Sequence, residues 1–420
     1  MKGRAFLAIL ALLCIVCSCG DNIGDDYVSS TRNETDNSVL LELLADISKK
    51  EVKMLGVFRT GGQYGLRKYG FVYSKTNDAP VLFGSGCIYR PVSNIVKDTF
   101  SVSIPLSVGE VVYARAFVIS DMNDTLYSEV DSCIIKKKLP WLETLPVDNR
   151  ARRGAIVVGH FRNAGNVGLK SWGCCISEGA LPTLEDKYEM AVDTAVDAVY
   201  HGEFGIFFDD LNENTLYHVR SYAITEELDT VYGEDRIFKT TFGGNFRWSW
   251  STVADSLEAV EAKAEKNIKE AVDSAVYYYN NYTNLSKELY IKYDPSVPTA
   301  DGNPNGNIRF GKNPTYQWVG TVQHEIAHTQ GVGYSDWKSM YSDGCWTKPV
   351  ALRTIRAMLM DQKQKLHGDN MHFWNCGINQ KSEVTVGKAN SYGVVIKGVR
   401  VLKANAIIVN GMRIDISNSK

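Results

Sequence analysis

The chain contains an internal repeat, and this repeat restricts its fold more than any other feature. Residues 56–70 read GVFRTGGQYGLRKYG and residues 159–173 read GHFRNAGNVGLKSWG, so the two stretches align without a gap. The correspondence resumes further along, where residues 115–129 match residues 220–234. A sequence that repeats over about 100 residues folds as copies of one structural unit. We therefore expect two similar domains ahead of a different third region.

Both copies of the repeat are predicted to be β-structure. Residues 113–117 (YARAF) and 217–222 (YHVRSY) alternate large apolar or aromatic side chains with polar or small ones, which is the period of a half-buried strand. Turn-forming Asn-Asp pairs at 77–78 and 123–124 separate such segments. Short strands at this spacing indicate β-sandwiches.

The order of these segments resembles a known family. YGFVYS at 69–74, YARAF at 113–117 and TLYSE at 125–129 are similar to the fibronectin type III-like modules of Bacteroidetes surface proteins. The resemblance implies two fibronectin III/Ig-like all-β sandwiches, over residues 49–138 and 139–241, that serve as spacers or adhesive units.

The pattern changes after the second copy, which predicts a third domain of α+β type over residues 246–420. Apolar residues recur at helical spacing over 253–279, and charged residues occupy the other face. Two short strands are expected at 288–293 and 307–311, and a helix is expected to begin near Tyr316.

The C-terminal tail, from Glu383 onward, is predicted to be β-structure. It contains the short apolar runs 394–396, 399–402 and 406–409, which are rich in valine and isoleucine. No chemistry is expected from it.

The expected helix after Tyr316 contains the sequence HEIAH, with His324, Glu325 and His328. Residues four apart on a helix share one face and lie roughly 6 Å apart along the axis. Two neutral imidazoles so placed can share one metal ion, most often Zn²⁺. Glu325 can then take a proton from a water on the open side of that ion. The alternative is a helix with two histidines that binds no metal.

A catalytic zinc needs three protein ligands and one open position, so a third ligand must come from elsewhere. Only two further histidines, His367 and His372, lie in the third domain. Asp336 follows the helix and could ligate the metal or orient a ligand histidine. Tyr334 is a poor ligand because a phenol has a pKa of about 10.

Two motifs resemble known metallopeptidases. HEIAHTQGVG at 324–333, followed by HFWNCGIN at 372–379, is similar to a pairing found in a group of secreted bacterial proteins. This resemblance favours His372 as the third ligand, with Asp336 and His367 as alternatives. HExxHxxG is also similar to the metzincins, but Tyr334 stands at their third-ligand position. Tyr334 is instead expected to donate a hydrogen bond to the developing oxyanion, with Tyr341 as the alternative.

The order helix, strand, loop, strand and metal helix is similar to the upper half of a zincin metallopeptidase. In zincins an extended substrate adds to the edge of the strand that lines the cleft. The resemblance therefore implies that Ile308 and Phe310 lie on the substrate edge. Cys345 and Cys376 are the only cysteines of this domain, and a disulfide between them could fix the His372 loop.

The N-terminus carries the features of an export signal. Basic residues precede a short apolar run at 5–16, which is too short to span a membrane. The run ends in VCSCG, which resembles a bacterial lipoprotein signal over residues 1–18 with Cys19 as the lipidated residue. Residues 19–48 would include a polar, flexible tether. An ordinary cleaved signal peptide is the alternative.

Together these patterns predict a surface-anchored, zinc-dependent metallopeptidase that hydrolyses extracellular proteins or glycoproteins. The similarity to surface-exported Bacteroidetes lipoproteins implies attachment to the outer membrane, exposed to the medium. The alternative is a non-catalytic lipoprotein whose zincin-like head binds a glycan or a protein. A net charge of −2 and the lack of a basic, aromatic-rich cluster give no sign of nucleic-acid binding.

Overall fold

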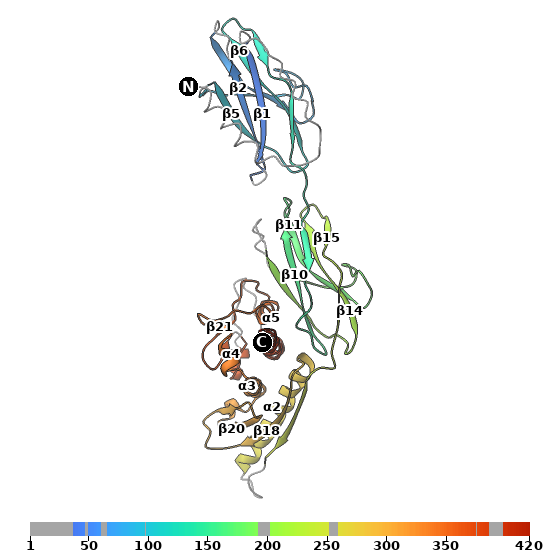
Figure 1. Ribbon diagram of the computed structural model, residues 1–420, viewed down its shortest axis with the longest axis vertical. Helices are drawn as coiled ribbons and strands as arrows, with labels where there is room; N and C mark the ends of the chain where they lie inside the picture. Colours follow the sequence, from blue (N-terminus) through green and yellow to red (C-terminus); the bar gives the residue numbers. More distant parts are fainter. Residues whose placement is uncertain are drawn as a thin grey trace. The chain divides into compact units, whose positions relative to one another are not determined.

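Figure 1 shows the computed structural model of the protein. It describes residues 37–46, 49–59, 65–96, 98–191, 202–251, 259–374, 376–385 and 398–420. The predicted signal peptide, Cys19 and all of the predicted tether except residues 37–46 lie outside these ranges. The structure is mostly β-sheet, with 40% strand and 22% helix. None of the described helices is long and apolar enough to cross a membrane.

The chain divides into two compact units, of which one ends at Ile135 and the other begins at Lys136. In the first unit two antiparallel sheets share one apolar core, as in a β-sandwich. Phe71 and Phe100, from opposite sheets, pack in this core with ring centroids 5.0 Å apart. The three-stranded sheet has the order β1-β2-β5, and the other has the order β4-β3-β6-β7 with β8 paired to β6. The strands are β1 Ser38–Asp46, β2 Glu51–Arg59, β3 Leu66–Ser74, β4 Ile88–Pro91, β5 Thr99–Pro105, β6 Val111–Ser120, β7 Thr125–Tyr127 and β8 Asp131–Ile134.

The second unit begins with a sandwich of the same topology. Its sheets have the orders β13-β10-β9 and β12-β11-β14-β15, with β16 paired to β14. The strands are β9 Trp141–Thr144, β10 Ala155–Asn163, β11 Leu169–Ser177, β12 Lys187–Met190, β13 Glu203–Phe208, β14 Leu216–Thr225, β15 Thr230–Tyr232 and β16 Arg236–Lys239. Strands β11 and β14 follow β3 and β6 at the offsets of the sequence repeat.

The side chains matched in the repeat make the same contacts in both sandwiches. The Arg115 guanidinium lies 4.8 Å from the centre of the Tyr127 ring, and that of Arg220 lies 4.4 Å from the Tyr232 ring. Each arginine also donates its Nε–H to the backbone carbonyl of the residue after its tyrosine. The repeated positions therefore specify a stacked Arg–Tyr pair on the five-stranded sheet.

The rest of the second unit is built on a mixed sheet with the order β17-β18-β20-β19. Strands β17 Asn245–Trp250, β18 Ser286–Tyr293 and β20 Asn307–Phe310 are parallel, and β19 Ala300–Gly302 pairs antiparallel with β20. A short antiparallel sheet lies apart from it, formed by β21 Tyr341–Ser342, β22 Cys345–Trp346, β23 His367–Gly368 and β24 Phe373–Trp374. The helices are α2 Ala259–Tyr282, the 3-10 turn η1 Pro314–Tyr316, α3 Val319–Thr329, α4 Ser335–Lys338, α5 Pro349–Leu359, α6 Lys381–Thr385 and α7 Val399–Asn418.

The prediction of β-structure for the C-terminal tail is wrong where the structure describes it. Residues 399–418 form α7, and residues 386–397, with the predicted run 394–396, lie outside the described ranges. The valines and isoleucines suggested a strand because they favour β-structure. However, Val401, Ile408, Met412 and Ile416 are buried at helical spacing. Tertiary packing against α5, α2 and α3 outweighs local propensity here.

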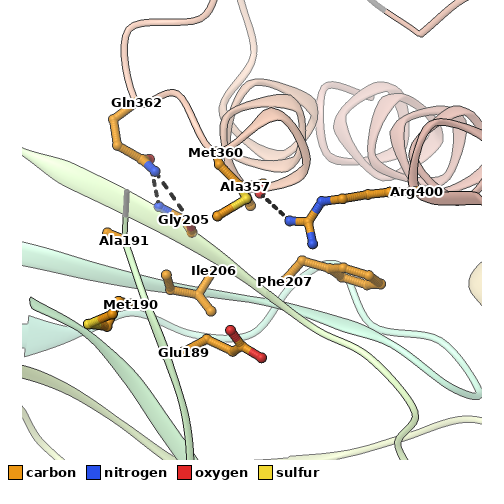
Figure 2. A pocket seen from close by; sticks show the side chains of 10 residues that line it. All are labelled: Glu189, Met190, Ala191, Gly205, Ile206, Phe207, Ala357, Met360, Gln362 and Arg400. Atoms are coloured by element: carbon orange, nitrogen blue, oxygen red, sulfur yellow. Dashed lines mark hydrogen bonds between the residues drawn. The ribbon is translucent and has the colours of Figure 1, made fainter. Parts of the chain in front are cut away.

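The second sandwich and the helices share one core. Leu145, Ile156, Val158 and Phe207 of the sandwich belong to the same apolar cluster as α5 and α7. Figure 2 shows part of this contact, where the Arg400 guanidinium lies 5.7 Å from the centre of the Phe207 ring. The second sandwich is therefore more than a spacer, because its apolar residues pack into the same core as α5 and α7.

Polar contacts reinforce this junction. The amide of Gln362 accepts a hydrogen bond from the Gly205 N–H at 2.9 Å (Figure 2). Asn149 donates to Thr354 Oγ1 at 2.8 Å and to the Ile407 carbonyl at 3.0 Å. Buried polar groups of this kind are satisfied only while both sides stay together.

The ion pair between Glu203 of β13 and Arg353 of α5 makes the stability of this junction depend on pH. Two hydrogen bonds of 2.6 and 2.8 Å join them, and the pair lowers the pKa of Glu203 below its ordinary value of 4.5. A lowered pKa means that stability is present above pH 4.5 and is lost as the pH falls through the folded-state pKa. We expect Glu203→Gln to make the unfolding free energy of the second unit less dependent on pH below about 4.5, as measured by urea unfolding. An unchanged pH profile in this variant would contradict the assignment.

Candidate metal centre

The candidate site is built on helix α3, whose sequence specifies both its burial and its end. Nine of its eleven residues are buried, among them Val322, Ile326 and Ala327 on its core face. The helix ends at Thr329 and is capped by Gln330, and Gly331 follows with φ +98°, a conformation that glycine adopts at little cost. A glycine therefore follows the end of the helix, and the helix begins at Val319, three residues after the predicted position.

Three histidines converge at this helix, and they are the ones that the two motifs favoured. His324 and His328 project from α3, and His372 comes from the turn between β23 and β24. One ring nitrogen of each lies within 4.8 Å of the others. The ring centroids are 5.0 to 5.6 Å apart. They are the only group of three or more possible metal ligands among the described residues.

A small cavity adjoins the three imidazoles. A cavity of about 10 Å³ is lined by the three histidines together with Ala327, Val332, Phe373, Gly377 and Asn405. This volume is about that of a single water-sized sphere. Imidazole nitrogens bind Zn²⁺ at about 2.1 Å, so two nitrogens bound to one ion lie roughly 3.4 Å apart. The ring nitrogens, which lie within 4.8 Å of one another, would have to draw closer together to hold one ion.

Hydrogen bonds orient the rings for metal binding. The Nδ1–H of His328 donates to the Val332 carbonyl at 3.0 Å. His372 Nδ1 lies 3.5 Å from an oxygen of Asp369, which also accepts from the backbone N–H of His372 at 2.7 Å. A partner at Nδ1 fixes the tautomer that leaves Nε2 as the lone-pair donor. Asp369 was missed in the sequence, although the Asp-x-x-His spacing of this tight turn could have indicated it.

Burial keeps the two helix histidines in the form that binds metal. Removal from water, together with the neighbouring His328 and His372, lowers the pKa of His324 to about 3. Burial also lowers the pKa of His328. Both rings are therefore neutral at physiological pH, and a neutral imidazole is the ligand species.

Glu325 lies in a dry environment on the same helix. Its side chain is only 3% exposed. Burial, and to a smaller extent the charge of Asp301, raise its pKa to about 8. A divalent cation nearby stabilises the carboxylate and so lowers this pKa. A buried carboxyl group that shifts between its two forms near neutrality suits proton transfer.

The strand beside Glu325 corrects one prediction. Ile308 and Phe310 belong to β20, which has β18 on one side and β19 on the other, so they do not lie on an edge. Both side chains are fully buried. The edge strand is β19, and Gly302 lies so close to α3 that an added Cβ would stand 2.6 Å from the Glu325 carbonyl. A strand of three residues carries no alternation of side chains that the sequence could reveal.

Among the described strands, none pairs with β19 on the side away from β20. Gly311 N–H donates to the Thr299 carbonyl and Asn303 N–H donates to the Asn307 carbonyl. Hydrogen-bonded pairs alternate along an antiparallel ladder, so Ala300 and Gly302 direct their backbone groups away from β20.

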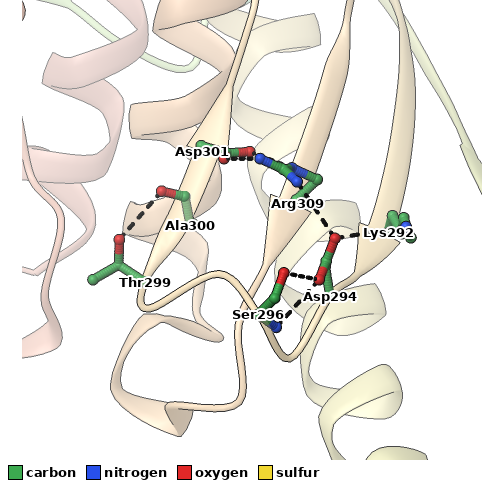
Figure 3. Close-up of polar contacts among 7 residues, drawn as sticks. All are labelled: Lys292, Asp294, Ser296, Thr299, Ala300, Asp301 and Arg309. Carbon is green, nitrogen blue, oxygen red and sulfur yellow. Dashed lines mark hydrogen bonds and ion pairs between the residues drawn. The ribbon is translucent and has the colours of Figure 1, made fainter.

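Charged side chains on the solvent face of the sheet link β19 to β20. Figure 3 shows Arg309 of β20 paired with Asp301 of β19 through two bonds of 3.0 and 2.6 Å, and reaching Asp294 at 3.4 Å. A groove of about 630 Å³ lies on this face, beside Asp301 and Gly302, and includes the half-exposed Tyr290. The β19 edge is thus held by the Arg309–Asp301 ion pair and has a groove beside it.

The other candidate residues lie elsewhere. Asp336 forms an ion pair of 2.7 Å with Lys420 and is not one of the three grouped ligands. His367 Nδ1 lies 3.5 Å from Cys345 Sγ. Cys345 and Cys376 are both free thiols, so the predicted disulfide is wrong. Cys345 lies beside His367, whereas Cys376 is buried in the apolar core of the second unit.

The two tyrosines proposed as oxyanion donors differ in their surroundings. Tyr334 is 41% exposed and stands at the start of α4, just after the glycine stop of α3. Tyr341 packs between Trp337 and Trp346, and its hydroxyl is buried without a hydrogen-bond partner among the described residues. Burial raises the pKa of Tyr341. Tyr341 is therefore a core residue, and Tyr334 is the better candidate for a donor.

Two comparisons with known proteins found no match for the chain. No model of a known protein family matches the chain. No curated protein matches it either. The chemistry of the site is therefore inferred from its own residues.

Proposed function

We propose that the chain is a zinc-dependent metallopeptidase with a zincin-like head, as its motifs imply. The observation that carries this proposal is the convergence of His324, His328 and His372 on one small cavity, with a buried glutamate on the same helix. Three histidines with an open fourth position form the ligand set of many catalytic zinc sites. A purely structural zinc site would be closed by a fourth side chain, and none is grouped with these three among the described residues.

The chemistry divides between the metal and the protein. Zinc bound by the three imidazoles would polarise a water and lower its pKa. Glu325 would accept a proton from a water as the water oxygen bonds to the scissile carbonyl carbon, and would pass the proton to the leaving nitrogen as the C–N bond breaks. Tyr334 is proposed to donate a hydrogen bond to the carbonyl oxygen as its negative charge develops.

An extended peptide is the substrate that suits this geometry. The outward backbone groups of Ala300 and Gly302 can pair with a peptide strand added to β19, which would replace the 3.2 Å hydrogen bond that the Ala300 carbonyl accepts from Thr299 Oγ1. Such a strand would run alongside the helix that carries Glu325, since Gly302 packs against that residue. We further propose that the substrate is an extracellular protein or glycoprotein. The basis is the sequence of the N-terminus, which resembles an export signal with lipid attachment at Cys19 and would hold the chain on the outer membrane.

The third ligand provides the direct test of the metal site. We expect the purified wild-type chain to bind one zinc ion, and His372→Ala to lower zinc affinity by more than about 100-fold, beyond what loss of a ligand-orienting group costs. His367→Ala is the matched control, because His367 lies on the same hairpin and contacts Cys345 instead. Zinc content after dialysis, measured by elemental analysis, distinguishes them. Zinc retained in His372→Ala, or no zinc in the wild type, would count against the proposal.

A further inference from the structure

The metal centre has a neighbour that no motif indicated. Asn405 lies in the middle of α7, is fully buried, and lines the cavity between the three histidines. A buried amide is costly unless its donors and acceptor are paired. The hydrogen-bond partners of Asn405 therefore show which segments of the chain it joins.

Asn405 joins the His372 loop to the helices around the site. Its Nδ2 donates to the Cys376 carbonyl at 2.8 Å, and only the nitrogen of the amide can donate to a carbonyl, so the side-chain orientation is fixed. Its Oδ1 lies 3.3 Å from the Tyr279 hydroxyl of α2. The same hydroxyl lies 3.2 Å from the carbonyl of Gln323, the residue before His324. One hydrogen-bond network thus reaches both the loop and the metal helix.

The loop needs this support at Cys376 in particular. Cys376 has φ +122°, a conformation that a residue with a side chain adopts only when its surroundings hold it there. Further along, Asn379 is already fixed, because its carbonyl accepts from Trp318 Nε1 at 3.0 Å and Thr321 Oγ1 at 2.6 Å. Cys376 lies between that anchor and His372, and Asn405 supplies its hydrogen bond from the side of α7.

We propose that Asn405 is a positioning residue for the metal centre: it holds the loop so that His372 stays within reach of the ion bound by His324 and His328. It does not ligate the metal. The inference rests on the proposed function, since it concerns the geometry of the proposed zinc site. It predicts that loss of the Asn405 amide weakens metal binding more than an equal disturbance of α7 elsewhere.

The same helix offers a matched control. Asn410 is also an asparagine of α7 and is 1% exposed. It donates to Asn149 at 2.7 Å and accepts from the Asn284 N–H at 2.9 Å. Neither partner belongs to the loop or to α3. Asn405→Ala and Asn410→Ala therefore remove the same group from the same helix, and only the first removes a contact to the site.

The experiment measures zinc affinity of the full chain by competition with a chelator. We expect Asn405→Ala to weaken zinc binding about 10–100-fold, the range found for groups that orient ligands, and Asn410→Ala to leave it within a few-fold. The visible absorption of Co²⁺ bound in place of zinc, which reports ligand number and geometry, should change only in the Asn405 variant. Melting of the metal-free variants records the general damage to α7.

The outcomes separate this inference from the proposed function. A wild-type chain that binds no zinc overturns both. Wild-type binding with equal affinity losses in the Asn405 and Asn410 variants, or with no loss in either, overturns the positioning role alone. Should Asn405→Ala fail to fold, Tyr279→Phe takes its place, because it removes one hydroxyl from the network and leaves the ring packing. It is expected to weaken zinc binding a few-fold and to shift the Co²⁺ spectrum, and a wild-type affinity and spectrum would contradict the proposal.

Discussion

Glu325→Gln is expected to bind one zinc ion per chain, as the wild type does, and to hydrolyse peptides about 10²–10⁴-fold more slowly. Glutamine has the shape of glutamate but cannot accept a proton from water at neutral pH. Because the residue is buried and no metal ligand is altered, the fold and the three imidazoles should remain as they are. Metal content therefore separates loss of the base from loss of the site.

The measurement is cleavage of a mixed peptide library, followed by mass spectrometry, with metal content measured on the same samples. Glu203→Gln serves as the control, since it makes the same chemical change at the sandwich junction. It should cleave at the wild-type rate at neutral pH. Full activity in Glu325→Gln would contradict a role as general base, and zinc binding without cleavage in the wild type would favour a binding protein.

The parts of the fold that could be predicted are those with long, periodic signals. The repeat at 56–70 and 159–173 predicted two similar β-domains, and their strands β3, β6, β11 and β14 have nine or ten residues, enough to show alternation. The helix at α3 was recognisable because HEIAH fixes a spacing of four residues and Gly331 marks its end. In each case local sequence and tertiary packing favour the same structure.

The parts that could not be predicted depend on packing between distant segments. α7 is rich in β-branched residues and is nevertheless helical, since its apolar face completes the core of the helical region. β19 exists because β20 offers it a ladder of backbone groups, and three residues carry no pattern of their own. Asn405 gains its role only because α7 is a helix that passes the His372 loop. The role of Asn405 could not be predicted from the sequence, because the C-terminal tail was expected to be β-structure.

The proposed third ligand could be predicted only in part. The count of histidines left His367 and His372, and chemistry alone could not choose between them. The hairpin that joins β23 to β24 makes the choice: His367 pairs across the strands with Trp374, beside Cys345, whereas His372 sits in the turn, held by Asp369. A difference of five residues in a short hairpin decides which imidazole reaches the cavity.

The shared core of the second unit joins the second sandwich to the helices that carry the proposed metal site. Phe207 of β13 is 6% exposed and contacts Tyr282 of α2 and Arg400 of α7. We expect Phe207→Ala to destabilise the second unit by about 3–5 kcal/mol, as for other large core truncations. For a unit of this size that corresponds to a melting temperature lower by roughly 10 °C. Because the core is continuous, the sandwich and the metal helix should unfold together, with release of zinc in the same transition.

Phe100→Ala is the matched control in the first unit. Phe100 is 2% exposed and packs against Phe71, so its truncation should cost the first unit a similar free energy. Calorimetry of the zinc-loaded chain should then show a lowered transition that does not release zinc, whereas Phe207→Ala lowers the one that does. Zinc retained through the transition that Phe207→Ala lowers would mean that the second sandwich unfolds apart from the metal site, and would return it to the role of a spacer. The junction predicts otherwise, because Asn149, Glu203 and Gly205 each have a hydrogen-bond partner on the helical side that unfolding of the sandwich would leave unpaired.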